Sequence, residues 1–338
     1  MIERAVDFER LRWMRCGTCS NEWRAHAEWL SRFHQGHERC PKCGTNCEAE
    51  RRPDFWAAQD DPSHDDSTVL DTFWYHTTTH ANWPDRAFNP TANLTDVTKR
   101  RLQAIGADGR GLERWAARQK AKALHLGTYE AAIENMLRRM TDQDGVDERF
   151  YLYRVRLRRD ASLEPGVHPE RADMMGDVQL AELGEAGIDI LRYVNTHEDP
   201  SSVSLAVRFE AILAVQVIPI PLPVTRADAW VSTAAARLLD AAARPAPEPK
   251  TRLERMQRHR PSALSIEASK LEEEVADTLP FGIRDRFHRL YNEKNLTAEP
   301  AAFPSKLVGL AALVNDPRAV FEFLETVPWR GVAPLRAG

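Results

Sequence analysis

Alternating hydrophobic and polar residues mark a strand in the middle of the chain. Over 149–159, Tyr151, Tyr153, Val155 and Leu157 fall on one side and mainly arginines fall on the other. This period of two is typical of a β-strand with one buried face and one wet face. Residues that favour β-structure predict further strands over 68–76, 189–196, 202–209 and 211–220.

Helical spacing of apolar residues flanks these strands. Residues 127–140 repeat small and apolar residues at helical spacing and carry Arg138 and Arg139 near their end. Further helices are predicted over 91–124 (broken around 106–111), 226–243, 265–280, 282–295 and 317–327, with a proline-rich spacer over 243–250. Because helices and strands do not alternate regularly, the pattern favours an α+β fold over a doubly wound parallel sheet.

Composition and charge narrow the class of protein. The 338 residues are 43% hydrophobic and 28% charged, as in a soluble globular protein of about two domains. The net charge of −4 gives no global electrostatic case for nucleic acid or an anionic membrane. The longest apolar run, 211–224, contains three prolines, and the N-terminus lacks an apolar signal core. We therefore expect a cytoplasmic protein that does not bind membranes.

The strongest local signal is a cysteine cluster. All five cysteines lie between residues 16 and 47, and twenty residues separate two Cys-x2-Cys pairs, formed by Cys16, Cys19, Cys40 and Cys43. This spacing predicts a structural zinc ion held by four thiolates, which supplies folding energy that a module of about 50 residues lacks. Gly17 and Gly44 suit the tight turns, where a positive φ is needed.

Other interpretations of the cluster remain open. Cys47 is an alternative ligand in place of Cys43, and His34 and His37 are weaker candidates. The cysteines could also be reduced and free of metal. With the ribbon assigned to 1–56, the remaining organisation is a linker over 57–68, an α+β domain over 69–224 and a helical accessory region over 225–338.

Residues 12–47 resemble a family of small zinc ribbons that have an aromatic residue after the first pair, here Trp23, and Cys-Pro-x-Cys as the second pair. The resemblance implies a recognition or docking module for a macromolecular target, with nucleic acid as one candidate. A closed four-sulfur site has no open coordination position, so catalysis at the metal is not expected.

Three polar segments of the middle domain are candidates for a ligand cleft. They are 74–80, where a strand ends in His and Thr; 124–132, where Gly-Thr-Tyr opens a helix; and 192–204, where a strand runs into a polar turn. Polar groups gathered at the ends of elements are what a ligand site needs.

These segments resemble three motifs of the ADP-ribosyltransferase superfamily, whose members consume NAD. The matching residues are Tyr75-His76-Thr77-Thr78, then Thr128-Tyr129-Glu130-Ala131-Ala132, then Tyr193, Asn195, Glu198, Asp199, Ser202 and Ser204. The resemblance spans about 70–220 and implies two split antiparallel sheets. It also implies that NAD is a substrate, whose ADP-ribose is transferred to a macromolecule or to water.

The resemblance also implies roles for these residues. Glu198 would accept a hydrogen bond from the ribose hydroxyl and stabilise an oxocarbenium-like transition state. His76 would bind the adenosine-side ribose, and Tyr129 would stack on the nicotinamide. The remaining NAD-binding candidates are Tyr75, Thr78, Gly127, Thr128, Tyr193, Asn195 and Ser202, with Thr78 or Thr128 holding the amide. Thr77 stands where the family usually has glycine.

Several alternatives stay open at this stage. The catalytic acid could instead be Asp199, Glu210 or Glu182. His76 and His80 could be surface residues or a metal pair. The whole protein could be a non-enzymatic zinc-ribbon adaptor for nucleic acid or protein, or a hydrolase, for which only the acidic run 60–66 offers a candidate site.

Overall fold

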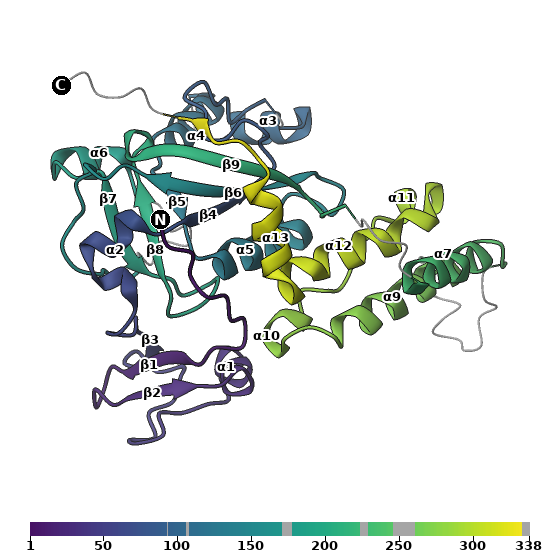
Figure 1. The fold of residues 1–338 in the computed structure, drawn as a ribbon, viewed down its shortest axis with the longest axis horizontal. Coiled ribbons are helices and arrows are strands. Elements are labelled where there is room, and N and C mark those ends of the chain that lie inside the picture. The colour runs from purple at the N-terminus through teal and green to yellow at the C-terminus, as the bar shows by residue number, and fades with distance from the viewer. Residues whose placement is uncertain (93, 106–107, 171–177, 224–228, 246–260, 333–338) are drawn as a thin grey trace.

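A computed structural model gives the fold, and it describes residues 1–338 except 93, 106–107, 171–177, 224–228, 246–260 and 333–338. A small N-terminal ribbon lies at one end, two antiparallel sheets form the middle, and a group of helices extends to the side (Figure 1). The predicted α+β class with antiparallel sheets is confirmed. The proposed spacer over 243–250 lies largely outside the described residues.

The ribbon is a three-stranded antiparallel sheet with one helix. Its elements are β1 (Arg12–Cys16), β2 (Glu22–Ala25), α1 (Ala27–His34) and β3 (Pro53–Phe55). The strand order is β2-β1-β3. Apolar residues of β1 and α1, such as Met14 and Leu30, are buried in a core that continues under the middle sheets. The ribbon therefore packs on the rest of the protein.

Two sheets build the middle of the molecule, one ordered β10-β9-β6-β4 and the other β5-β8-β7. The strands are β4 (Trp74–Thr78), β5 (Leu124–Leu126), β6 (Phe150–Leu157), β7 (Ile190–Val194), β8 (Val203–Val207), β9 (Ile212–Ile220) and β10 (Arg330–Gly331). All their pairings are antiparallel. Backbone hydrogen bonds of 3.0 Å in both directions between Tyr75 and Gly127 join β4 to the residue after β5. The three motif segments thus meet where the sheets join.

The expectation that one face of β6 is exposed to solvent is wrong. Arg154 is only 5% exposed, lies 3.7 Å from the ring centre of Phe73, and forms an ion pair with Glu3. Arg156 stacks over Trp329. Segments distant in sequence cover the arginine face, so the alternation reflects two buried faces of different polarity.

The helices before the C-terminal region are short except one. They are η1 (Pro62–His64), α2 (Asp66–Asp71), α3 (Asp96–Gln103), α4 (Gly111–Lys120), α5 (Tyr129–Asp142), α6 (Leu180–Glu185) and η2 (Phe209–Ala211). The strand expected over 68–76 begins as α2, because Asp65 caps that helix by accepting from the N–H of Ser67 at 2.9 Å. Residues 57–68 contain η1 and the start of α2.

The C-terminal region is helical but arranged differently from the expectation. Its helices are α7 (Ala229–Ala242), α9 (Ala263–Ala276), α10 (Phe281–Arg284), α11 (Glu293–Ala298), η3 (Pro300–Ala302), α12 (Phe303–Asn315) and α13 (Pro317–Glu325). A helix was expected over 282–295, but only its ends are helical, and α12 was missed. One core joins α5 to α9, α12 and α13, and β10 pairs with β9. The C-terminal helices therefore pack on the middle domain through α12 and α13, while α7, α9 and α11 extend to the side (Figure 1).

Candidate active-site cleft and metal centre

The ribbon brings four cysteine sulfurs together. The Sγ atoms of Cys16, Cys19, Cys40 and Cys43 all lie within 4.8 Å of one another. Two of the separations are 3.6 Å, for Cys16 and Cys43, and 3.7 Å, for Cys19 and Cys40. Four sulfurs bound at about 2.3 Å around a tetrahedral zinc ion would be roughly 3.8 Å apart. The cysteines are therefore positioned to bind a metal ion, as the spacing predicted.

The turns around this site differ in one detail from the expectation. Gly44 has φ +70°, as expected, but Gly17 does not have a positive φ. A Cβ at Gly17 would lie 3.0 Å from the carbonyl oxygen of Arg51, so a larger residue would have to displace that backbone by a few tenths of an ångström. Ser20, with φ +54°, takes the left-handed position of the first turn. Cys47 is buried in the core outside the cluster.

A cleft of about 990 Å³ lies where the ribbon helix α1, helices α5 and α10 and the β7–β8 loop meet. Four acidic residues line it: Glu134, Glu170, Glu198 and Asp285. Six basic residues line it: Arg10, Arg12, Lys122, Arg138, Arg139 and Arg286. Four histidines also line it: His34, His76, His125 and His197. This small excess of basic over acidic groups favours an anionic ligand. Three of the arginines also pair with carboxylates, Arg10 and Arg12 with Asp199 and Arg138 with Glu198.

Glu198 follows strand β7 and lines this cleft. Its Oε1 accepts hydrogen bonds from Asn135 Nδ2 at 2.9 Å and from Arg138 Nε and Nη2 at 3.1 and 2.8 Å. Its backbone N–H donates to Asn195 Oδ1 at 2.9 Å, which fixes the turn. Among the described residues no donor is found on Oε2. The carboxylate is thus held by α5 with one oxygen available to a ligand.

His76, on β4, lines the same cleft. Its ring stacks on Trp83 with centroids 4.2 Å apart, and its Nδ1 lies 2.9 Å from the carbonyl oxygen of His125. A carbonyl only accepts, so Nδ1 carries the proton and Nε2 is an acceptor. Burial, with Arg139 nearby, lowers the pKa of His76 to about 3. The imidazole is therefore neutral and suited to accept from a hydroxyl group.

Tyr129 does not join these two residues, which corrects the expectation for it. Its hydroxyl donates to the carbonyl oxygen of Leu313 at 2.7 Å. Its ring is 2% exposed and packs edge-on against Tyr75 and Phe321, with centroids 5.3 and 5.2 Å apart. Helices α12 and α13 cover the first turn of α5, so Tyr129 is a core residue and cannot stack on a ligand in the cleft.

The other expected NAD-binding residues divide into structural groups and cleft groups. Tyr75 donates to Glu3 Oε1 at 2.6 Å in the core, and buried Thr78 accepts from the N–H of His80 at 3.3 Å. Tyr193 lines the cleft, with its hydroxyl 2.9 Å from His125 Nδ1. No group of three metal-ligating side chains surrounds His76 or His80 in the described part of the chain.

Residues of the second and third motifs mainly hold the backbone in place. Thr128 caps α5 by accepting from the N–H of Ala131 at 3.0 Å, and Gly127 pairs with β4. Asn195 donates from Nδ2 to Ser204 Oγ at 2.9 Å, and its backbone N–H donates to the carbonyl oxygen of buried Ser202 at 2.8 Å. These contacts shape the loop that carries Glu198.

The alternative acids lie elsewhere. Glu210 pairs with Arg86 at 2.9 Å and does not line the cleft. Glu182 belongs to the capping box of α6 and lines a separate cavity of about 290 Å³. Asp199 is 1% exposed and is engaged by arginines. Glu198 is therefore the acid of this set that a ligand in the cleft could reach.

Sequence reasoning missed the arginines of the N-terminal segment. Arg10 and Arg12 line the cleft and contact the β7–β8 loop. A charged N-terminus is ordinarily typical of a solvated surface, and nothing local in the sequence distinguishes these two residues. Arg138 was noted only for its place near the end of α5.

Comparisons with protein-family models, curated proteins and solved structures give no match to this chain. None of the described helices combines the length and apolar character needed to span a membrane. The cleft offers a neutral histidine, a carboxylate held by α5, and a lining with more basic than acidic groups.

Proposed function

We propose that the protein is an NAD-dependent ADP-ribosyltransferase that acts on a macromolecular target. The observation that carries this proposal is that His76 and Glu198, from motifs about 120 residues apart in the chain, line one basic cleft. That cleft is large enough for a dinucleotide at about 990 Å³. The split antiparallel sheets and the resemblance of the three motifs support the same function.

The reaction breaks the bond between nicotinamide and the ribose carbon. Nicotinamide leaves with the electron pair, and an acceptor on the target, or water, bonds to that carbon and releases a proton. The transition state carries positive charge on the ribose. Glu198 would accept from the ribose 2-hydroxyl and stabilise that charge, while Arg138 holds the carboxylate in place.

The remaining groups would bind the rest of NAD. His76, neutral with Nε2 as acceptor, would take a hydroxyl of the adenosine-side ribose. Basic side chains of the wall that hold neither Asp199 nor Glu198, such as Arg286, would complement the pyrophosphate. Tyr129 has no direct part in this scheme, and the phenylalanine and tyrosine rings at the wall are Phe8, Tyr193 and Phe281.

We further propose that the cysteine cluster holds a structural zinc ion. When bound, the ion would cross-link the two Cys-x2-Cys turns and stabilise the ribbon without entering the reaction. The ribbon would then serve as a targeting module, since α1 forms part of the cleft wall.

Nicotinamide release from NAD by the purified full chain tests the proposal. Glu198→Gln keeps the size of the side chain and removes its charge, so we expect release to fall by about 100-fold or more. Glu210→Gln is the matched control, because this alternative acid lies outside the cleft, and it should release nicotinamide at the unmodified rate. No release by the unmodified protein, together with salt-sensitive binding to nucleic acid, would favour the adaptor instead.

A further inference from the structure

The N-terminal segment that leads into the ribbon makes several hydrogen bonds to the loop that carries Glu198. Arg10 donates to Asp199 Oδ1 from Nε at 2.9 Å and from Nη2 at 2.7 Å. Its Nη2 also donates to the carbonyl oxygen of Pro200 at 2.8 Å, and its Nη1 reaches Ser201 Oγ at 3.3 Å. One side chain thus contacts three consecutive residues of the loop.

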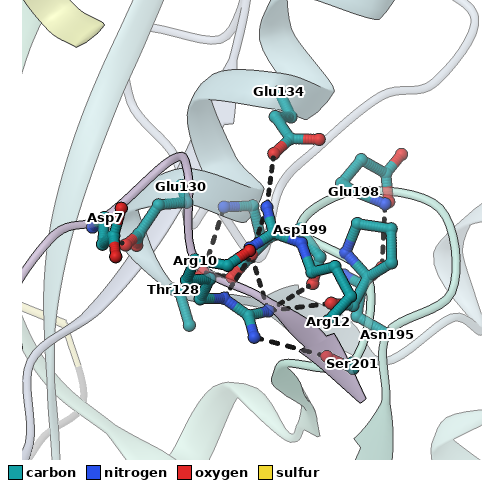
Figure 2. Close-up of polar contacts among 12 residues, drawn as sticks. Asp7, Arg10, Arg12, Thr128, Glu130, Glu134, Asn195, Glu198, Asp199 and Ser201 are labelled. Atoms are coloured by element: carbon teal, nitrogen blue, oxygen red, sulfur yellow. Dashed lines mark hydrogen bonds and ion pairs between the residues drawn. The ribbon is translucent and has the colours of Figure 1, made fainter. Parts of the chain in front are cut away.

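Other groups complete this network, which Figure 2 shows around Asp199. Arg12 Nη2 lies 3.3 Å from Asp199 Oδ1 and 3.8 Å from Glu134. Thr128 donates to the other oxygen, Asp199 Oδ2, at 2.7 Å. The backbone N–H of Trp13 donates to Ser201 Oγ at 3.0 Å. A buried carboxylate needs such partners, because an unpaired charge would be strongly disfavoured.

The loop backbone needs these contacts as well. Asp199 has φ +49° and Ser201 has φ +67°, both in the left-handed region that favours glycine. Residues other than glycine keep this conformation when their surroundings determine it, and such positions concentrate at functional sites. Glu198 is the residue immediately before this stretch, so its position depends on the same contacts.

The segment that carries Arg10 and Arg12 is continuous with the cysteine cluster of the ribbon. Arg12 is the first residue of β1 and Cys16, one of the four clustered cysteines, is the last. The register of β1 is fixed by pairing with β2 and β3 inside the ribbon. The paired strand therefore links Cys16 directly to Arg12, and Arg10 precedes the strand by two residues.

We infer that Arg10 and Arg12 are positioning residues for Glu198, through which the metal-loaded ribbon holds the loop over residues 195–202 in its working conformation. The catalytic role of Glu198 rests on the proposed function, but the structural coupling between the ribbon and the loop over residues 195–202 does not. The ribbon would be an integral part of the site as well as a targeting module.

Hydrogen–deuterium exchange tests the coupling without any reaction. We expect Arg10→Gln to speed exchange in peptides covering 195–204 by about tenfold or more, since these amides open locally once the loop is released. Chelation of the metal from the full chain should do the same. Arg32→Gln is the matched control, because Arg32 pairs with Glu38 inside the ribbon at 2.8 Å. Unchanged exchange in both Arg10→Gln and the chelated protein would overturn the inference.

Kinetics of nicotinamide release then separate positioning from folding. Misplacement of Glu198 should lower kcat about tenfold or more in Arg10→Gln with little change in KM for NAD, and Arg10→Lys should recover part of it. Asp199→Asn provides a second variant, because asparagine tolerates the left-handed backbone but loses the charge, and it should show the same loss. An unchanged kcat in these variants would refute positioning. If the unmodified protein releases no nicotinamide, the proposed function fails while the exchange experiment still decides the coupling.

Discussion

Glu130 gives a sharp test of the buried charge network, because its ionisation should cost stability. It lies in the first turn of α5, is 5% exposed, and accepts from the N–H of Asp7 at 2.7 Å (Figure 2). Burial, reinforced by the neighbouring charge of Asp199, raises the pKa of Glu130 from 4.5 to about 7. The perturbation is Glu130→Gln, which removes the charge and keeps an acceptor oxygen.

The direction in which stability changes with pH follows from how tightly Glu130 holds its proton in the folded and unfolded states. The folded protein holds the Glu130 proton more tightly than the unfolded chain, so its contribution to stability is full below pH 4.5 and is lost as the pH rises to about 7. At 1.36 kcal/mol per tenfold change in proton affinity, the loss is roughly 3 kcal/mol. Glutamine avoids this loss but has one acceptor oxygen fewer, so we expect it to add about 2 kcal/mol at pH 8.

The free energy of unfolding in urea, measured at about pH 5 and about pH 8, is the assay. Glu130→Gln should gain about 2 kcal/mol at the higher pH and less than about 1 kcal/mol at the lower. Glu113→Gln is the control, because the Glu113 side chain is 70% exposed, and it should change little at either pH. A loss of stability at pH 8 in Glu130→Gln would refute the account of the buried cluster.

Two further predictions concern the core and the metal centre. Tyr129→Phe removes the hydrogen bond to Leu313, so it should lower the free energy of unfolding by about 1 kcal/mol and leave nicotinamide release within about twofold. A large loss of activity in a stable Tyr129→Phe protein would mean that this phenol acts in catalysis. The purified chain should contain one zinc ion, measured by mass spectrometry of the metal, and Cys19→Ser should lose it while Cys47→Ser keeps it. Equal zinc content in both variants would contradict the assignment of the ligands.

The features that could be predicted from sequence are those set by local residues. The cysteine spacing predicted the cluster, because each pair sits in its own turn. Strand β6 was predicted from its alternation, but its buried arginine face was not, since the covering Phe73 and Trp329 come from distant segments. Helix α12 was missed because eight of its thirteen residues are buried and it shows little helical periodicity.

The candidate site shows the same division. The motif resemblance led to His76 and Glu198, which do line one cleft. It failed for Tyr129, because the later helices that bury this ring cannot be placed from the motif itself. Arg10 was missed because its partners lie about 190 residues further along the chain. Contacts over such separations depend on the packed fold, which local pattern does not determine.

The structure of the Glu198→Gln protein crystallised with NAD tests the central claim most directly. We expect the dinucleotide in the cleft between α1, α5 and the β7–β8 loop, with the nicotinamide-side ribose beside residue 198. A hydroxyl of the other ribose should lie within hydrogen-bond distance of His76 Nε2. NAD bound away from both residues, or no NAD in the cleft at saturating concentration, would contradict the claim.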